Sequence, residues 1–193
     1  MKIEKEIRSI TNGFDVENRH ITGYGILFES ESVDMGFIEV IKRGAVTQEQ
    51  LDSSDIFIYF NHNPEEVLAR SINGVGSVKL VVDERGVKYE FDAPNTTKGD
   101  ELLEHIKRGE LFGSSFGFSL PVDGSGERWE KRDGKYYRTI TKIERVYELS
   151  CVYSPAYSNT TCENRAEDKV NEFEAMLLNL DKQLAEIEEI AKY

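Results

Sequence analysis

Short β-type runs separated by turns fill the first 160 residues, and this pattern constrains the fold more than any other feature of the sequence. The runs at residues 20–30, 37–43 and 56–60 have the length and the apolar content of strands. Residues 75–94 hold two more runs on either side of the turn sequence DERG, which is typical of a hairpin. Residues 135–153 form a longer β-like segment. We therefore expect a mainly β domain over residues 1–160.

One helix and one helical turn interrupt this pattern. The helix is predicted over residues 96–110, because Thr97 can cap its start and Gly109 can end it. Leu102 and Ile106 would then lie on one buried face. The helical turn is predicted within TQEQLDS, directly after the second β-type run.

The composition changes near residue 161. From about residue 163 onward the chain has no Gly or Pro and is rich in Glu, Ala, Lys and Leu. Apolar residues recur there at alternating spacings of three and four, at Val170, Phe173, Leu177, Leu180, Leu184, Ile187 and Ala191. This spacing predicts an amphipathic, coiled-coil-like helix over 161–193. Such a helix either packs on its own domain or pairs with another chain, and the sequence leaves both open.

Acidic residues follow every second position of this apolar seam, at Glu174, Asp181 and Glu188. A symmetric parallel dimer would gain little from charge pairs across the helices, whereas a basic partner helix would gain more.

The overall charge disfavours one class of partner. The chain has 36 acidic and 24 basic side chains and a formal net charge of −12. Binding to nucleic acid requires Lys and Arg side chains near the phosphates, so no nucleic-acid partner is expected. The N-terminus has no apolar core of a signal peptide and no segment is long and apolar enough for a membrane span, so we expect a cytosolic protein. Cys151 and Cys162 indicate two plain thiols in a reducing compartment.

The segment LFGSSFGFS contains the pattern G-x-S-x-G at residues 113–117. In α/β-hydrolases this pattern lies between a strand and a helix, and the catalytic histidine follows the serine in the chain. Here FGFSLP alternates like a strand, and all three histidines precede Ser115. The match to the nucleophile elbow is therefore a coincidence.

A serine nucleophile still needs a general base, and His62 is the best candidate among the three histidines. It follows the apolar run IFIYF, which would hold it rigidly at the rim of a sheet, and its neighbours Asn61, Asn63 and Pro64 favour a turn. His20 is expected at an exposed strand start, and His105 at the surface or edge of the predicted helix.

Five segments resemble the prohead proteases of tailed double-stranded DNA phages in order and in approximate spacing. They are GYGILFES, FIEVIKRGAV, FNHNPEEVLAR, the run from GVKYEFD to FGSSFGF, and ELSCVYSPAYSNTT. The resemblance covers about residues 1–162. Its most specific parts are the Asn-His pair at 61–62, the Ser-Phe-Gly-Phe run at 115–118 and the segment at 148–156.

The resemblance implies an α+β fold similar to that of the herpesvirus assemblins, a small and mainly antiparallel β-barrel with packed helices. It also implies a serine endopeptidase that cleaves scaffold and capsid-protein extensions, and itself, during prohead maturation. The partners would be the major capsid protein and scaffold segments, in the host cytoplasm and inside the prohead.

By the same resemblance, His62 corresponds to the catalytic histidine and Ser115 to the nucleophile. Ser114 is the fallback, because successive strand residues point to opposite faces and only one of the two serines can face His62. The family's segments beyond the catalytic domain imply that residues 161–193 are a targeting or assembly helix on a cleavable linker, through which a homodimer could also form.

A third catalytic residue must orient the histidine, and Glu148 is the candidate. In RVYELSCVY the alternation places Glu148 on one face with Val146, Ser150 and Val152, where a buried carboxylate would need a partner. The alternative is that Glu148 pairs with Arg145 or Arg138. Glu144 and Asp133 are weaker candidates for the role.

Two other functions compete with the peptidase. One is a non-enzymatic capsid-assembly β-domain, with the C-terminal helix as its interaction element. The other is a cysteine hydrolase that uses Cys151 and His62, but Cys151 alternates onto the face opposite Glu148, where a buried inert thiol is expected. No metal and no cofactor is predicted, since the sequence has no H-E-x-x-H and no closely spaced histidine pair.

Overall fold

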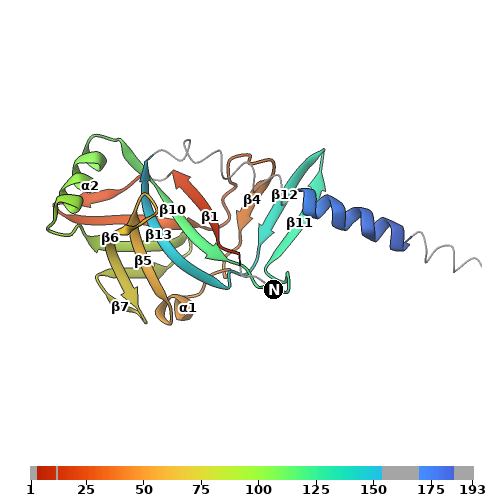
Figure 1. The fold of residues 1–193 in the computed structure, drawn as a ribbon, viewed down its shortest axis with the longest axis horizontal. Coiled ribbons are helices and arrows are strands. Elements are labelled where there is room, and N and C mark those ends of the chain that lie inside the picture. The colour runs from red at the N-terminus through yellow and green to blue at the C-terminus, as the bar shows by residue number, and fades with distance from the viewer. Residues whose placement is uncertain (1–3, 12, 154–169, 185–193) are drawn as a thin grey trace, which may run out of the picture.

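The computed structural model describes residues 4–11, 13–153 and 170–184 (Figure 1). The two named helices are α1 (Gln48–Asp52) and α2 (Thr97–Lys107). The strands are β1 (Glu6–Thr11), β2 (Asp15–Glu17), β3 (His20–Leu27), β4 (Ile38–Ile41), β5 (Asp55–Phe60), β6 (Asn63–Ile72), β7 (Val75–Gly76), β8 (Val78–Val82), β9 (Gly86–Asp92), β10 (Leu111–Ser119), β11 (Glu127–Arg132), β12 (Lys135–Ile140) and β13 (Arg145–Tyr153).

The described strands form three open sheets, not the closed barrel that the resemblance predicted. A six-stranded sheet has the order β1-β10-β13-β5-β6-β7, a four-stranded sheet the order β2-β3-β9-β8, and a three-stranded sheet the order β11-β12-β4. Most pairs are antiparallel, as predicted, but β13 pairs with β5 and β12 with β4 in parallel. The mainly β character of the domain is therefore confirmed.

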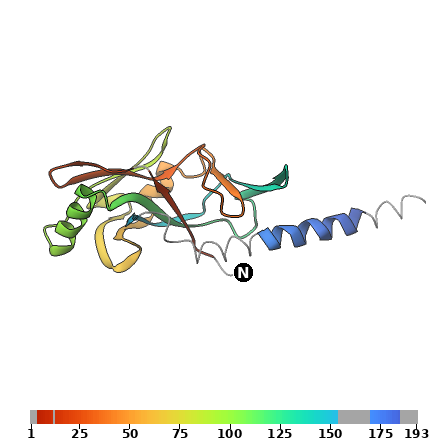
Figure 2. The same cartoon turned by 90° about the horizontal axis from the view of Figure 1, so that it is seen from above.

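The core lies between the six-stranded and four-stranded sheets and is closed at one end by α2 (Figures 1 and 2). Phe116 and Phe118 of β10, Leu149 of β13 and Tyr89 and Phe91 of β9 are all buried in it. Burial of these apolar side chains is the main contribution to the stability of the fold. The six-stranded sheet is thus held rigidly from one side, which leaves its other face for polar residues.

Several local predictions are confirmed. β8 and β9 form the expected hairpin around DERG, and α1 begins after Thr47 within TQEQLDS. In α2, Leu102 is buried and Ile106 packs against the core. The helix cap is Thr96, whose extended backbone lets its side chain accept a hydrogen bond from Gly99, so the predicted cap at Thr97 is wrong by one residue.

Two parts of the sheet architecture were not predicted. β1 runs along β10 over its whole length, although the N-terminal segment showed no strand pattern. The segment 135–153 is divided into β12 and β13, which belong to different sheets. Its bend is held by backbone hydrogen bonds from Thr141 to Gly126 and from Ile143 to Ala45.

A buried ionic cluster fixes β1 against the three-stranded sheet. Arg138 is completely buried, and its guanidinium donates two hydrogen bonds to Glu6 at 2.5 and 2.8 Å and one to Glu39 at 2.8 Å. Its Nε atom donates to Glu127 at 2.5 Å, and Arg8 donates to both Glu6 and Glu39. Burial alone would lower the pKa of Arg138, but the surrounding carboxylates raise it. This cluster therefore anchors β1 to the three-stranded sheet.

Residues 170–184 form a helix, as the heptad spacing predicted (Figure 1). Phe173 packs beside Trp129 and Tyr136, with ring centroids 5.5 and 5.8 Å apart. Pairing of this helix in a coiled coil remains a prediction. The predicted linker at 157–168, Cys162, Ile187 and Ala191 lie outside the described residues. No helix in the described ranges is long and apolar enough to cross a membrane.

Candidate active site

His62 lies in the tight turn between β5 and β6. Phe60 pairs with Asn63, so Asn61 and His62 are the two central residues of a two-residue hairpin. Both have positive φ angles, 48° and 62°, as a type I′ turn requires, and asparagine and histidine adopt this region more readily than most other non-glycine residues. The tight turn follows register shifts in the β5–β6 pair and holds His62 at the edge of the six-stranded sheet.

The imidazole of His62 points at Glu148. His62 Nδ1 lies 3.3 Å from Glu148 Oε2, and the histidine side chain is 26% exposed while that of Glu148 is 2% exposed. A carboxylate only accepts hydrogen bonds, so this contact requires a proton on Nδ1, and in the neutral imidazole Nε2 then carries the free lone pair. The alternative pairing of Glu148 with Arg145 or Arg138 is wrong. Arg138 is engaged by Glu6, Glu39 and Glu127, and the Arg145 guanidinium lies over the Tyr147 ring.

Three donors surround the Glu148 carboxylate. Besides His62, Ser150 Oγ donates to Oε2 at 2.7 Å and Lys5 Nζ donates to Oε1 at 2.5 Å. Burial raises the pKa of Glu148, but the hydrogen bonds from His62, Lys5 and Ser150 outweigh that effect and lower it to about 2. Glu148 is therefore ionised throughout the neutral range.

Ser115 lies on the same face of the six-stranded sheet as Glu148. In the β10–β13 pair, Ser115 is opposite Ser150 and Gly117 is opposite Glu148, so Ser115 and Glu148 occupy diagonal positions. A side chain at Gly117 would collide with Lys5 Cε at 2.3 Å and press on Glu148 Oε1 at 3.0 Å. The glycine therefore leaves the space that the Glu148 and Lys5 side chains fill.

The neighbouring serine points the other way. Ser114 is hydrogen-bonded to Tyr89 at 2.7 Å inside the core, on the opposite face from Ser115. This agrees with the expectation that only one of the two serines can share a face with His62. Cys151 is also completely buried on the core side, and burial raises the pKa of its thiol to about 12, so it is not a nucleophile at neutral pH.

The hydroxyl of Ser115 is engaged by β1 in this conformation. It donates to the carbonyl oxygen of Arg8 at 2.8 Å and accepts from Ser9 Oγ at 2.9 Å. Ser115 is also completely buried. No hydrogen bond joins it to His62 within the described part of the chain. A role for Ser115 as a nucleophile would require that its hydrogen bond to Arg8 breaks and that the hydroxyl becomes accessible.

The other predicted candidates lie elsewhere. His20 begins β3 at the surface and contacts Asp92, and His105 in α2 contacts Glu110. Asp133 has a positive φ of 50° in the turn between β11 and β12, and Glu144 is an exposed partner of Lys142. In the described ranges, no hydrogen bond or ion pair joins any of these four residues to His62 or Ser115. Glu148 is therefore the candidate third residue that contacts the histidine there.

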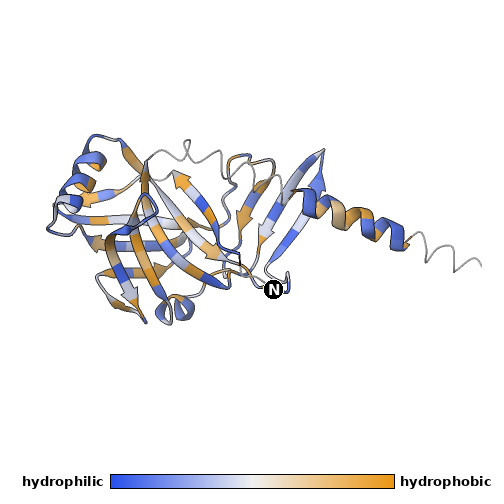
Figure 3. Cartoon of the chain, viewed as in Figure 1, coloured by the Kyte–Doolittle hydropathy of each residue, from blue (hydrophilic) through white to orange (hydrophobic). Residues whose placement is uncertain are grey.

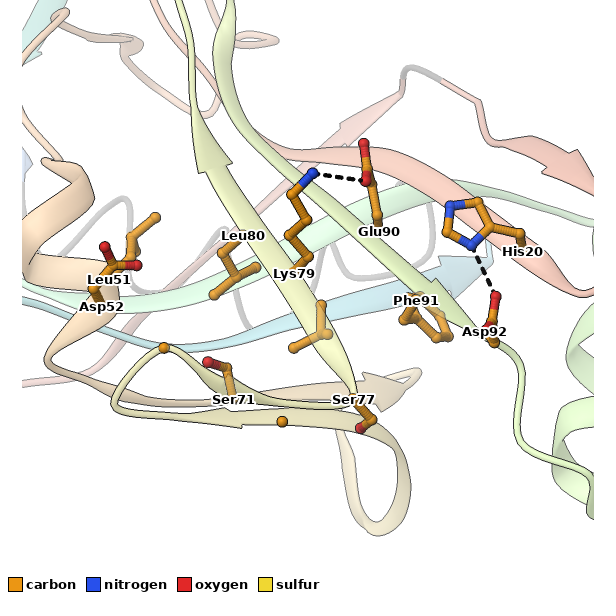
Figure 4. Close-up of a pocket in the computed structure, with 13 residues that line it drawn as sticks. His20, Leu51, Asp52, Ser71, Ser77, Lys79, Leu80, Glu90, Phe91 and Asp92 are labelled. Atoms are coloured by element: carbon orange, nitrogen blue, oxygen red, sulfur yellow. Dashed lines mark hydrogen bonds and ion pairs between the residues drawn. The ribbon is translucent and has the colours of Figure 1, made fainter.

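A hollow in the described surface lies away from this site. A pocket of about 420 Å³ lies where β8 and β9 approach the β6–β7 hairpin and α1 (Figure 4). Ser71, Lys79, Glu90 and Phe91 are among its lining residues. It contains neither His62, Ser115 nor Glu148. In the described ranges, no three His, Cys, Asp or Glu side chains are grouped to hold a metal ion.

Two residues around the site were not predicted, and a third was placed but given no role. The alternation of the strand put Ser150 on the face of Glu148, but its hydrogen bond to the carboxylate was not anticipated. Lys5 and Ser9 could not be predicted, because they reach the site only through the pairing of β1 with β10.

The fold and the sequence of this chain both resemble those of known proteins. The fold is similar to that of the bacteriophage T4 capsid assembly protease gp21, with a TM-score of 0.50 and 12% sequence identity over 79% of this chain and 99% of that one. At this identity the likeness is one of fold. No match to a curated protein was found.

The family model of the caudovirus prohead serine proteases matches residues 5–176, which is most of the chain. The protein belongs to this family, as the resemblance implied, and this membership supports a serine peptidase of capsid maturation.

Proposed function

We propose that the protein is a serine endopeptidase that cleaves scaffold and capsid-protein extensions, and itself, inside the prohead. His62 is its general base, Ser115 its nucleophile and Glu148 the residue that orients and stabilises His62. The observation that carries this assignment is the contact between His62 Nδ1 and the buried, ionised Glu148, on the sheet face that also bears Ser115.

The roles follow from the protonation states. With its Nδ1 proton directed at Glu148, His62 offers Nε2 to accept the Ser115 proton. The Ser115 oxygen attacks a peptide carbonyl, and His62 then delivers the proton to the departing amine. A water molecule, activated by the same imidazole, releases the acyl group and regenerates Ser115. Glu148 stabilises the imidazolium that forms in each half of the reaction without itself accepting the proton.

The position of β1 sets a condition on this reaction. Since Ser115 is buried and bonded to Arg8 and Ser9, the described conformation is a resting one. The β1 strand must shift before the hydroxyl can meet both His62 and a substrate carbonyl.

The test is co-expression of the chain with its capsid protein, followed by intact-mass measurement of both proteins over time. The native pair should yield shortened capsid protein and shortened peptidase, and the Ser115→Ala pair should stay at full length. Ser114→Ala is the matched control, because it removes an adjacent hydroxyl that faces the core. This variant should retain cleavage. Its stability should fall by about 1 kcal/mol, because the hydrogen bond to Tyr89 is lost.

The outcomes separate the alternatives. Persistent cleavage in Ser115→Ala would reject Ser115 as the nucleophile. A native pair that is never cut would favour an assembly role over a peptidase. The masses of the shortened peptidase would also test self-cleavage in the segment 157–168.

The C-terminal helix has a separate role in this proposal. Residues 163–193 act as a targeting or assembly element, so their removal should leave peptide hydrolysis intact and abolish incorporation into proheads. Loss of hydrolysis together with incorporation would instead make the helix part of the catalytic fold.

A further inference from the structure

Ser150 lies inside the six-stranded sheet, directly beside the proposed catalytic residues. Its strand, β13, carries hydrophilic positions among hydrophobic ones (Figure 3). The neighbours of Ser150 across the sheet are Ser115 of β10 and Tyr59 of β5. Its side chain is completely buried. A buried hydroxyl needs a hydrogen-bond partner, and the partner of Ser150 is a carboxylate of its own strand, that of Glu148.

Ser150 and His62 share one oxygen of Glu148. Ser150 Oγ donates to Oε2 at 2.7 Å, and His62 Nδ1 lies 3.3 Å from the same atom. A hydrogen bond from a hydroxyl to a carboxylate is strong at this length, whereas 3.3 Å is long for a hydrogen bond from a ring nitrogen. The serine therefore holds Oε2 more firmly than the histidine does.

The Glu148 side chain needs this second support. It has three rotatable bonds, and its other oxygen, Oε1, accepts a hydrogen bond from Lys5 Nζ at 2.5 Å. Without the Ser150 hydroxyl, the carboxylate could rotate and keep its bond to Lys5 while Oε2 moves away from His62. The hydroxyl thus fixes which way the carboxylate faces.

Lys5 cannot replace Ser150 during the reaction that we propose. Lys5 directly precedes β1, and its side chain is 43% exposed. The proposed function requires β1 to shift before Ser115 can react, and Lys5 would shift with it. Ser150 belongs to β13, which is paired with a strand on each side, so its hydrogen bond to Glu148 can persist.

We propose that Ser150 is a positioning residue of the peptidase. Its hydroxyl fixes Glu148 Oε2 opposite His62 Nδ1, and thereby keeps the imidazole in the tautomer that leaves Nε2 free to accept a proton. Ser150 acts only through Glu148 and takes no proton in the reaction. This inference rests on the proposed function, because it explains how the third residue of the proposed triad stays aligned while β1 moves.

The tautomer of His62 tests this role without any need for hydrolysis. The full-length chain is labelled with nitrogen-15 histidine, and the ring nitrogens are observed by NMR at a pH where the imidazole is neutral. His62→Asn identifies the His62 signals among those of the three histidines. We expect the proton mainly on Nδ1 in the native chain. Ser150→Ala should move it towards Nε2, because the carboxylate is no longer held against Nδ1.

Two further variants separate positioning from packing. Ser150→Thr keeps the hydroxyl and should keep the native tautomer. Ser119→Ala removes another buried serine hydroxyl of the same sheet, which is bonded to the Tyr147 hydroxyl at 3.1 Å. It should leave the tautomer of His62 unchanged. Denaturant unfolding of each variant shows whether it is folded.

Hydrolysis of a peptide that spans a mapped cleavage site provides the second readout. Ser150→Ala should lower kcat roughly 10–100-fold with little change in KM, because the loss falls on the transition state and not on substrate binding. Since Ser150 acts through Glu148, adding Ser150→Ala to Glu148→Gln should lower kcat by less than about twofold further. Two residues that act independently would instead multiply their effects.

A native tautomer in Ser150→Ala, or the same change of tautomer in Ser119→Ala, would overturn the inference. So would a loss of kcat that is as large in the Glu148→Gln background as in the native one. A chain that hydrolyses peptides equally well with and without the Ser150 hydroxyl refutes this inference alone. A chain that never hydrolyses peptides, but whose His62 tautomer depends on Ser150, refutes the proposed function alone.

Discussion

His62 Nδ1 and Glu148 Oε2 lie 3.3 Å apart, although one residue comes from a hairpin turn and the other from the middle of a buried strand. The parallel pairing of β13 with β5 brings them together, because it sets Cys151 beside Phe60, the last residue before the turn. The histidine thereby gains an ionised partner on one nitrogen, and its other nitrogen stays available for the proton transfer that we propose.

We predict that Glu148→Gln lowers kcat by about 10²–10⁴-fold with little change in KM. Glutamine can still contact His62, but it offers no charge to the imidazolium and can favour the wrong tautomer. The measurement is steady-state hydrolysis of a peptide spanning a mapped cleavage site. A variant with native kcat would show that Glu148 has no part in the reaction.

The same carboxylate should make stability depend on pH. The pKa of Glu148 is about 2 in the folded chain and near its ordinary value of 4.5 when unfolded. A lowered pKa stabilises the fold at pH values above 4.5, and this stabilisation is lost as the pH falls from 4.5 towards 2. We expect it to reach roughly 2–3 kcal/mol, with the lower figure allowing for solvent screening of Lys5. Denaturant unfolding of native and Glu148→Gln chains should therefore converge as the pH falls through this range, and a constant difference would contradict the assignment.

His62→Asn should abolish peptide hydrolysis while the chain stays folded. Asparagine tolerates positive φ better than histidine, so the turn between β5 and β6 should still form. The substitution also removes the hydrogen bond from His62 to Glu148, which leaves Lys5 and Ser150 as donors to that carboxylate. The free energy of unfolding, from urea titration, is therefore expected to fall by about 1–2 kcal/mol. A variant that keeps native hydrolysis would reject His62 as the general base.

Arg138→Ala should destabilise the chain by about 3–5 kcal/mol, because it leaves three carboxylates without their buried cation. Arg132→Ala, at an exposed arginine in the same hairpin, is the control and should change stability by less than about 0.5 kcal/mol. Hydrogen exchange of the β1 amides should accelerate in Arg138→Ala before that of β13 does. If the β1 amides were equally protected from exchange in both variants, the ionic cluster would not be what anchors β1.

Features that depend on local sequence patterns could be predicted from the sequence alone. Strand alternation separated Ser115 from Ser114 and put Glu148 and Ser150 on one face, and the turn residues after IFIYF placed His62 at a sheet edge. The β8–β9 hairpin and the helix at 170–184 followed from equally local signals.

The features that were not predicted from the sequence depend on contacts between segments that are distant in the chain. β1 carries Glu6 and Arg8 on a buried face, and such a strand is stable only because Arg138 and Glu39 neutralise it. No sequence pattern near residue 6 predicts that pairing. The bend between β12 and β13 has no Gly or Pro, so TITKIE looked like continuous strand. Its hydrogen bonds run to Gly126 and Ala45, which only the folded chain brings close.

The most direct test of Ser115 as the nucleophile is covalent trapping during turnover. A chain that is cleaving its co-expressed capsid protein is treated with a fluorophosphonate, digested, and mapped by mass spectrometry. We predict a single adduct on Ser115, which should be absent from both Ser115→Ala and His62→Asn. An adduct on Ser150 or Ser114, or one on Ser115 that persists in His62→Asn, would contradict this prediction.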